Sequence, residues 1–305
     1  HVSISDQKLL LDWRYSAKQY EASTIERFVA KYAHYIETLV AHCADPAHGG
    51  FTPSDFPMAG LEQAPLDTLV AAVLSAGESK ADLVDIYPLT KMQQGMLSRS
   101  LIAPNSGVYV IQHAVELRGP LDAEALQWAW REVMHRHDVF RTRFWGLGSD
   151  RPLQIVKQAA PLPWRAYDWS DVSEAEQVQR FEQLLHATSC QDYDYARAPL
   201  MRLSLVRLST ERHRFIWDNH HALADGWSSG VIWQEAMQLY RAKVDGVAAG
   251  LPSVSSRYRD YVGWLRKKDH SQSERFWKEY LSGMAVTPLP SEGLDGGGET
   301  TGRSE

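Results

Sequence analysis

The chain has 305 residues, 44% of them hydrophobic and 23% charged, and a formal net charge of -6 at neutral pH. This composition suits one large or two modest globular domains. The net negative charge and the scattered basic residues argue against nucleic-acid binding, and no apolar run approaches the ~20 residues needed to span a membrane. Cys43 and Cys190 match no metal or redox spacing, so a reducing, cytoplasmic setting is expected.

Residues 1–45 predict one strand and one helix. Leu9 to Trp13 has the character of a short strand, and residues 23–43 carry an apolar stripe at helical spacing. Ser23 or Thr24 is expected to cap this helix in a capping box. One strand and one helix bury too little surface to fold alone. The segment is therefore either an extension that packs on the next domain or the tail of a preceding domain.

Residues 46–85 predict an interdomain linker, followed by a domain over residues 86–305. Pro, Gly and Ser accumulate at the start of the linker, and a weaker helix is expected at residues 63–74. The domain opens with the sequence IYPLTKMQQGML. Its proline favours an extended approach, and Thr90 is expected to cap a helix that follows.

Strands and helices alternate through the middle of the chain. The patterns predict strands at residues 108–118, 140–145, 152–158 and 199–208, and helices at 122–136 and 174–189. Asp122 is expected to cap the first of these helices. Residues 164–169 are predicted to be irregular. Strands mixed with helices in this way predict an α/β sandwich.

The stretch with the most chemical content is Asn219–Ser228, with the sequence NHHALADGWS. It follows an expected strand at residues 212–218 and precedes an expected helix at residues 228–243. His220 and His221 therefore lie where a strand ends, a place from which a rigid scaffold can present a side chain to a cleft. Histidine is the side chain that most readily gains or loses a proton near neutral pH.

The residues alone leave several roles open for this turn. A histidine can accept a proton from a nucleophile or hold that nucleophile by a hydrogen bond, or both histidines can be ordinary strand-end residues. Asp225 can orient a histidine, pair with an arginine or cap the following helix. Gly226 can supply the positive φ angle of a tight turn. A metal site of His and Asp lacks an obvious third ligand nearby.

His220-His221-x-x-x-Asp225-Gly226 resembles the HHxxxDG signature of condensation domains in nonribosomal peptide synthetases and of related acyltransferases. Four other stretches resemble motifs of the same family, in the same order. They are residues 86–97 (family motif YPLTPMQEGML), 136–144 (RHxxLRTxF), 258–264 (YxDYxxW) and 276–281 (FWxxYL). Lys91, Gln94 and Phe140 depart from the usual residues of these motifs.

The resemblance implies a chloramphenicol acetyltransferase-like α/β sandwich, formed by residues 86–305 as the N-terminal lobe of a two-lobe domain. In the family a second lobe closes the substrate tunnel. It does not follow residue 281 here, so we expect this chain alone to be weakly active or inactive. Residues 1–45 resemble the closing segment of a preceding condensation-type or epimerization domain. Such a tail would suit a condensation domain that accepts a D-configured donor.

The implied reaction is amide-bond formation between a donor acyl or peptidyl thioester and an acceptor aminoacyl thioester. Each substrate is carried on the phosphopantetheine arm of a carrier protein, and neither a directly bound cofactor nor a metal is expected. His221 occupies the position tied to catalysis, with His220 structural and Gly226 beside the substrate. The resemblance also implies that Arg141 pairs with Asp225 from across the fold.

The implied partners are the carrier proteins upstream and downstream, with adjacent adenylation and condensation or epimerization domains in the same polypeptide. Two other functions stay open. One is a stand-alone acyltransferase that uses coenzyme A or an acyl carrier protein. The other is a non-catalytic fragment that only docks carrier proteins or neighbouring domains.

Overall fold

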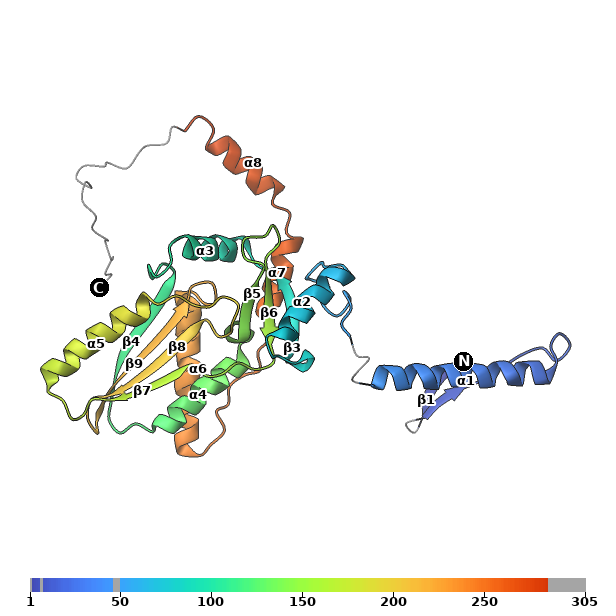
Figure 1. Ribbon diagram of the computed structural model, residues 1–305, viewed down its shortest axis with the longest axis horizontal. Coiled ribbons are helices and arrows are strands. Elements are labelled where there is room, and N and C mark those ends of the chain that lie inside the picture. Colours follow the sequence, from blue (N-terminus) through green and yellow to red (C-terminus); the bar gives the residue numbers. More distant parts are fainter. Residues whose placement is uncertain (1, 6–7, 46–49, 285–305) are drawn as a thin grey trace. The chain divides into compact units, whose positions relative to one another are not determined.

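The computed structural model describes residues 2–5, 8–45 and 50–284 and divides the chain into two units, residues 1–251 and 252–305. Figure 1 labels most of the elements. The first unit contains β1 (Val2–Ser5), β2 (Lys8–Leu11), α1 (Ala22–Ala44), α2 (Gln63–Ser75), the 3-10 helix η1 (Lys80–Asp82), β3 (Leu83–Pro88), α3 (Lys91–Ile102), β4 (Val110–Arg118), α4 (Ala123–Arg136), the 3-10 helix η2 (Asp138–Arg141), β5 (Thr142–Trp145), β6 (Leu153–Lys157), β7 (Trp164–Asp168), α5 (Glu174–Ser189), β8 (Met201–Arg207), β9 (Arg212–His220) and α6 (Gly226–Asp245). The second contains α7 (Tyr258–Lys267) and α8 (Ser271–Tyr280). No helix in the described ranges is both long and apolar enough to cross a bilayer.

The larger sheet has the strand order β4-β9-β8-β7 and places β9 at its centre. β4 and β8 both pair with β9 in antiparallel register, and β7 joins β8 in parallel. The strands predicted at residues 108–118, 199–208 and 212–218 are confirmed. The prediction that residues 164–169 are irregular is wrong, because they form β7. This edge strand is mostly exposed, so it lacks the apolar alternation that identifies a strand.

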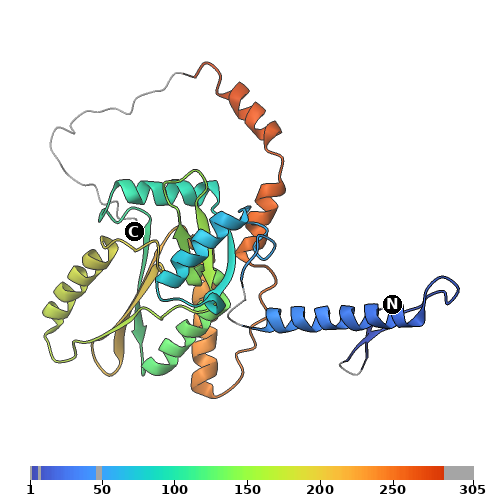
Figure 2. The same cartoon turned by 45° about the vertical axis from the view of Figure 1, so that its right-hand side comes forward.

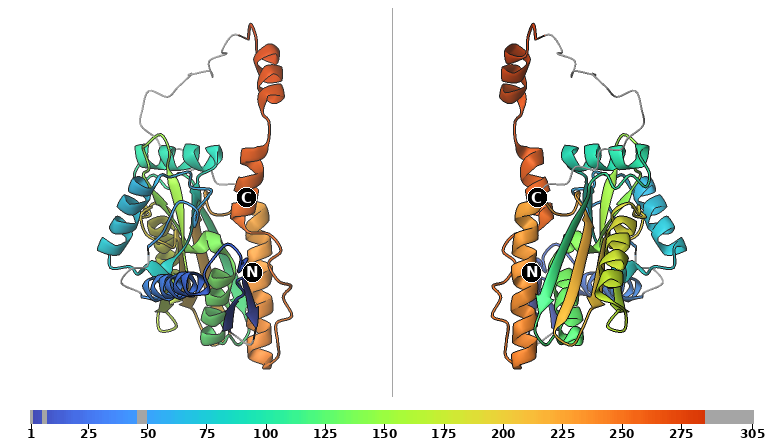
Figure 3. Two further views of the ribbon diagram at one scale, coloured as in Figure 1. Left: turned by 90° about the vertical axis from the view of Figure 1, so that its right-hand side faces the viewer. Right: turned by 90° about the vertical axis from the view of Figure 1, so that its left-hand side faces the viewer.

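Helices cover both faces of this sheet (Figure 3). On one face α4 and α6 contribute to the main core, where the Trp130 ring lies 5.5 Å from the ring of Phe215 and 5.0 Å from that of Trp217. On the other face Phe181 of α5 packs with Ile216 of β9. Each fully buried aromatic side chain contributes roughly 1.5–3 kcal/mol of transfer free energy. The helix–sheet–helix layers confirm the predicted α/β sandwich.

Local capping agrees with the sequence for two helices and differs for a third. The Thr90 side chain accepts a hydrogen bond from the Gln93 N–H at the start of α3, and Asp122 accepts one from Ala125 at the start of α4. Both caps are confirmed. The capping box predicted for α1 is wrong, because that helix begins at Ala22 after Glu21, which makes no side-chain cap. Ser23 and Thr24 therefore lie within the first turn.

A smaller sheet has the order β3-β6-β5, and α2 packs against it within one apolar cluster (Figure 2). The members of the cluster are Phe56, Ala59, Leu66, Leu69, Val70, Val73, Leu83, Ile86, Leu153 and Ile155. The segment predicted as a linker thus contains a helix that contributes buried side chains to this lobe. The predicted domain boundaries themselves stay a prediction.

The N-terminal elements form a local assembly. β1 and β2 pair as an antiparallel hairpin, and the Trp13 ring lies edge-on at 5.4 Å from Phe28 and 5.2 Å from Tyr32 of α1. No side chain of α1 is buried.

In the second unit, the helices expected at residues 258–265 and 274–281 are present as α7 and α8. Aromatic rings stack along each helix. Tyr261 stacks on Trp264 in α7, with ring centroids 6.0 Å apart, and Phe276 stacks on Tyr280 in α8, with centroids 5.7 Å apart.

Candidate active site

The histidine turn lies between the end of β9 and the start of α6. β4 runs beside it, with Val110 opposite His220 in the ladder, and the His221 N–H donates to the Tyr109 carbonyl at 2.8 Å. Within the turn, the Leu223 N–H donates to the His220 carbonyl at 2.9 Å. Residues 222–224 are buried in the main core, so the turn is anchored by apolar contact as well as by backbone hydrogen bonds.

His220 is fully buried, and both of its ring nitrogens have partners. Its Nδ1 accepts a hydrogen bond from the Ala222 N–H at 3.1 Å, so the proton of the neutral ring is assigned to Nε2, which lies 3.0 Å from the Ser100 Oγ. Burial, with a smaller contribution from neighbouring His221, lowers the pKa of His220 to about 4. The ring is therefore neutral near pH 7, which suits the predicted structural role.

His221 has different surroundings. Its side chain is half-buried, and its ring lies edge-on to that of Tyr109, with ring centroids 6.4 Å apart and an interplanar angle of 69°. Its Nδ1 is buried and has no hydrogen-bond partner within the part of the chain that the structure describes. His221 is thus only partly enclosed, whereas the neighbouring histidine is fully enclosed.

Asp225 caps α6 and does not meet Arg141. Its Oδ1 accepts from the Ser228 N–H at 2.7 Å, and hydrogen bonds with Ser228 lower the pKa of Asp225. Of the roles left open by the sequence, helix capping is therefore the one observed. The carboxylate lies at the positive end of the helix dipole, where negative charge is stabilised.

Arg141 is buried at the C-terminal end of α4, only 7% exposed. Its guanidinium donates to the carbonyls of Met134 at 3.1 Å and His135 at 3.2 Å, contacts the Lys157 carbonyl, and pairs with Asp138 at 2.6 Å. The predicted Arg141–Asp225 pair is wrong. The reason is local: carbonyls at a helix C-terminus attract a cation, and a guanidinium has a fixed number of donors.

Gly226 is the first residue of α6, and it is not among the described glycines with positive φ. The expectation that it supplies the left-handed angle of a tight turn is wrong, because the chain enters the helix directly. A Cβ atom at this position would meet no heavy atom within 4 Å. The glycine thus leaves open space beside the turn.

Gln93 and Gln154 support the turn and were missed by the sequence reasoning. The buried Gln93 Nε2 donates to the Ala222 carbonyl at 3.1 Å, while its Oε1 accepts from the Thr90 N–H at 3.0 Å and from Gln154 Nε2 at 3.2 Å. The three-residue spacing between Thr90 and Gln93 could have indicated the bond from the Thr90 N–H. The tie to Ala222 spans 129 residues and has no local signal.

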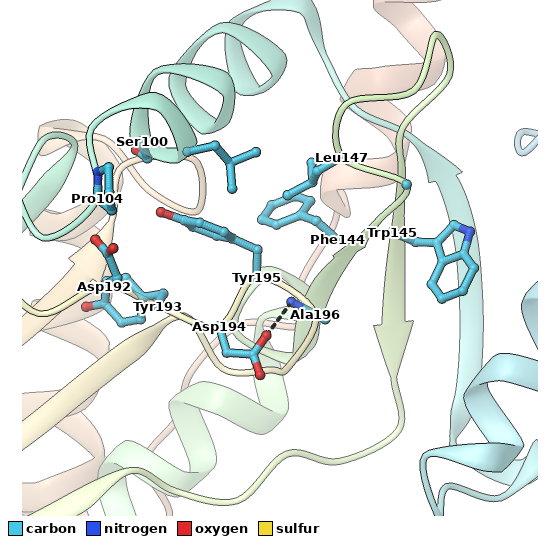
Figure 4. Close-up of a pocket in the computed structure, with 12 residues that line it drawn as sticks. Ser100, Pro104, Phe144, Trp145, Leu147, Asp192, Tyr193, Asp194, Tyr195 and Ala196 are labelled. Carbon is cyan, nitrogen blue, oxygen red and sulfur yellow. Dashed lines mark hydrogen bonds between the residues drawn. The ribbon is translucent and has the colours of Figure 1, made fainter.

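A cavity of about 410 Å³ lies between the end of α3, the start of the loop after β5 and the residues 192–196 that precede β8 (Figure 4). Its lining is largely aromatic and apolar, with Ser100 and two aspartates. Tyr195 lines the cavity and places its ring edge-on to His220, with centroids 5.5 Å apart. Burial raises the pKa of Tyr195, and a hydrogen bond with Ser100 partly opposes this. His220 therefore lies behind one wall of the cavity. In the described ranges, no group of three or more His, Cys, Asp or Glu residues is arranged to hold a metal ion.

Comparison with known sequences identifies relatives across most of the chain. The family model described as "Condensation domain" matches residues 84–301. A linear gramicidin synthase polypeptide of Brevibacillus parabrevis is 34% identical over 287 residues, which cover 94% of this chain and 5% of that protein. Bacitracin synthase 1 of Bacillus licheniformis is 31% identical over 271 residues, with coverages of 88% and 5%. The chain thus spans only a small part of these large relatives.

Solved structures show the same fold. The starter condensation domain of the rhizomide synthetase RzmA superposes with a TM-score of 0.59 at 19% identity, covering 66% of this chain and 49% of that one. The SgcC5 protein from Streptomyces globisporus gives a TM-score of 0.55 at 27% identity, with coverages of 66% and 47%. The chain spans about half the length of each structure, which corresponds to the single chloramphenicol acetyltransferase-like lobe predicted from the sequence.

The histidine turn observed at the end of the central strand falls within the matched region, and so do all five motifs that the sequence suggested. The match covers more than half of the chain, and relatives above 30% identity align with nearly all of it. This chain therefore belongs to the condensation domain family of nonribosomal peptide synthetases.

Proposed function

We propose that this chain is the N-terminal lobe of a condensation domain that joins a donor acyl or peptidyl thioester to an acceptor aminoacyl thioester through an amide bond. The observation that carries the proposal is the contrast within the histidine pair. His220 is enclosed, with both ring nitrogens bonded, whereas His221 is only half-buried at the end of the central strand, and its buried Nδ1 has no partner among the described residues.

In the proposed reaction, the acceptor amine attacks the carbonyl carbon of the donor thioester. A C–N bond forms, the tetrahedral intermediate collapses, and the C–S bond breaks to release the thiol of the donor arm. The proton lost by the amine balances the one taken up by the departing sulfur. His221 would hold the amine by a hydrogen bond or carry this proton. Thioesters are already activated, so positioning of two tethered reactants supplies much of the remaining rate enhancement.

Gly226 has a supporting role in this proposal. Its backbone N–H lies in the first turn of α6, where helix N–H groups lack intrahelical partners and favour negative charge. The open space beside its Cα leaves room for a substrate carbonyl. This N–H would donate to the developing oxyanion. His220 and Asp225 would maintain the turn through the Ala222 and Ser228 contacts, and Arg141 would support the fold at the end of α4.

The substrates of the proposed reaction are thioesters on the phosphopantetheine arms of carrier proteins, one upstream and one downstream. Adenylation and condensation or epimerization domains of the same cytoplasmic polypeptide are the other proposed partners. Residues 1–45 would be the closing segment of such a preceding domain. An epimerization domain there would suit a donor of D configuration, which a donor-stereochemistry assay on the full-length synthetase would check.

The experiment is product detection by mass spectrometry with the full-length protein and carrier proteins loaded with donor and acceptor. Wild type is compared with His221→Ala, and His186→Ala, an exposed histidine of α5, is the matched control. We expect dipeptidyl carrier from wild type and from the control, and loss of product with His221→Ala. Equal product from all three would make His221 structural.

Two further outcomes separate the other functions. Turnover from coenzyme A thioesters without carrier proteins would support a stand-alone acyltransferase. Folded protein that binds loaded carriers and forms no product would support a non-catalytic docking role.

A further inference from the structure

Tyr109 has a backbone conformation that its residue type disfavours. Its φ angle is +61°, and within the described ranges only Asn105 shares a positive φ among non-glycine residues. The left-handed region is common for glycine and accessible to Asn and Asp, but it is a genuine outlier for a bulky aromatic residue. Such outliers persist where the surrounding structure holds them, and they concentrate at functional sites.

The conformation places the Tyr109 carbonyl against the histidine turn. The β4–β9 ladder ends at the Val110–His220 pair, and Tyr109 is the next residue outward. Its carbonyl accepts a hydrogen bond from the His221 N–H at 2.8 Å, one bond beyond the ladder. The left-handed residue thus immediately precedes β4, and its carbonyl still holds the backbone of His221.

The Tyr109 side chain contacts the same histidine. Its ring lies edge-on to His221 at 6.4 Å between centroids and tilted by 51° to the ring of His220 at the same separation. These separations lie within the range of favourable aromatic pairs. Tyr109 as a whole residue is 36% exposed, so it is not enclosed by the core as His220 is. The buried His221 Nδ1 has no hydrogen-bond partner in the described structure, so the edge-on contact with Tyr109 is a side-chain contact that can set the orientation of the imidazole.

The loop that carries Tyr109 is fixed on both sides, so the unfavourable angle cannot relax by a shift of the loop. The Asn105 N–H donates to Asp192 Oδ2 at 2.9 Å, and the Ser100 hydroxyl donates to the Val108 carbonyl at 3.3 Å. Gly107 passes so close to α5 that a Cβ atom there would lie 2.7 Å from the Ser189 carbonyl oxygen. These contacts over-determine the loop, which is the condition for retaining a strained residue.

We propose that Tyr109 is a positioning residue for His221, with its carbonyl holding the backbone and its ring setting the orientation of the imidazole. This inference rests on the proposed catalytic role of His221. A tyrosine is used in place of glycine or asparagine because the aromatic ring, and not the backbone angle alone, is needed at this position.

The test compares Tyr109→Gly and Tyr109→Phe in the full-length protein, with Asn105→Gly as the matched control. Tyr109→Gly accepts the left-handed angle and deletes the ring, Tyr109→Phe retains the ring, and Asn105→Gly makes the same backbone change in the same loop. We expect Tyr109→Gly to lower kcat by about tenfold or more with KM nearly unchanged, since small misplacements of a reacting group have effects of this size. Tyr109→Phe and Asn105→Gly should retain near wild-type kcat.

Two physical readouts distinguish positioning from a general structural role. The melting temperature of Tyr109→Gly should equal or exceed that of wild type, because relief of the left-handed angle offsets the lost ring contact. The NMR resonances of the His221 ring should shift in Tyr109→Gly and not in Asn105→Gly.

The following outcomes would overturn the inference while wild type and His221→Ala still behave as proposed. They are wild-type kcat in Tyr109→Gly, an equal loss in Tyr109→Phe, or a loss that follows a fall in melting temperature. An inactive wild type, or an active His221→Ala, would instead count against the proposed function on which the inference rests.

Discussion

The histidine turn and the segment around Arg141 belong to two motifs of one family, but their polar groups are used differently. The Arg141 guanidinium is surrounded by backbone carbonyls and Asp138 at the end of α4, so its donors are occupied within the fold. His221 is held by its backbone N–H and by a ring contact, and its half-buried imidazole is not enclosed. A motif residue whose hydrogen-bonding groups are all occupied supports structure, whereas one with an open face is available for chemistry.

The largest expected effect on stability comes from Arg141. We expect Arg141→Ala to lower the free energy of unfolding by about 3 kcal/mol or more, because it removes the donor to several buried carbonyls and breaks a buried ion pair. Denaturant-induced unfolding measures the change. Arg165→Ala, at an exposed site on the edge strand β7, is the control and should change stability by less than about 0.5 kcal/mol. A similar small loss in Arg141→Ala would contradict the structural role.

His220 should make the protein sensitive to acid. Its pKa is lowered to about 4 in the folded state, against about 6.5 in an unfolded chain. Between these values the unfolded state binds a proton that the folded state does not. The contribution of the neutral His220 ring to the free energy of unfolding is therefore fully present above pH ~6.5. It falls as the pH drops, and roughly 3 kcal/mol is lost at pH ~4. The free energy of unfolding, measured across this pH range, should depend less steeply on pH in His220→Gln than in wild type. Equal slopes would show that another group governs the acid limb.

Gln93 tests how firmly α3 holds the turn. Gln93→Leu leaves the buried Ala222 carbonyl without its donor, so we expect a loss of about 1–3 kcal/mol. Hydrogen exchange at residues 221–224 should accelerate in the same variant, which reports local loosening of the turn. Gln94→Leu, one position along the helix, is the matched control. Equal exchange in both variants would indicate that the turn does not depend on this amide.

Asp225 should have a smaller effect. Removal of its cap in Asp225→Ala should lower stability by about 1 kcal/mol, and Asp225→Asn should retain most of it. Because bonds with Ser228 lower the pKa of Asp225, the contribution of the charged cap is present above the unfolded pKa of about 3.9. It is lost as pH falls through the lower folded value. Thermal unfolding at pH 7 and at acid pH measures both effects.

The combination of Asp225→Ala with Arg141→Ala sharpens the contrast between the two motifs. Residues with separate partners lose stability additively, so we expect a coupling free energy within about 0.5 kcal/mol of zero. A coupling free energy of several kcal/mol would indicate that Arg141 and Asp225 interact directly, as the family resemblance implied.

The parts of the fold that the sequence predicted depend on nearby residues. α5 occupies the predicted residues 174–189, and the caps at Thr90 and Asp122 form over three residues. The edge strand β7 was not predicted, because neither of its faces is consistently buried and its side chains show no apolar alternation.

The candidate site was predictable only in part, for the same reason. The paired histidines at a strand end, and Asp225 before a helix, are local patterns, and they identified the turn. The contact of Gln93 with Ala222 joins residues 129 positions apart, and the carbonyl partners of Arg141 have no side-chain signature. Neither contact is encoded in any pattern visible along the chain.

The packing of α2 on the β3-β6-β5 sheet has a consequence for exchanging domains between synthetases. A junction placed at residue 84, where the family match begins, would separate Leu66, Leu69 and Val73 from Ile86 and Ile155. The recipient sheet would then present an apolar face to water unless the donor sequence supplied a helix of matching shape, and such faces promote aggregation. A crossover placed before Phe51 keeps the helix with its own sheet. Chimeras joined there should stay in solution at concentrations where those joined at residue 84 precipitate.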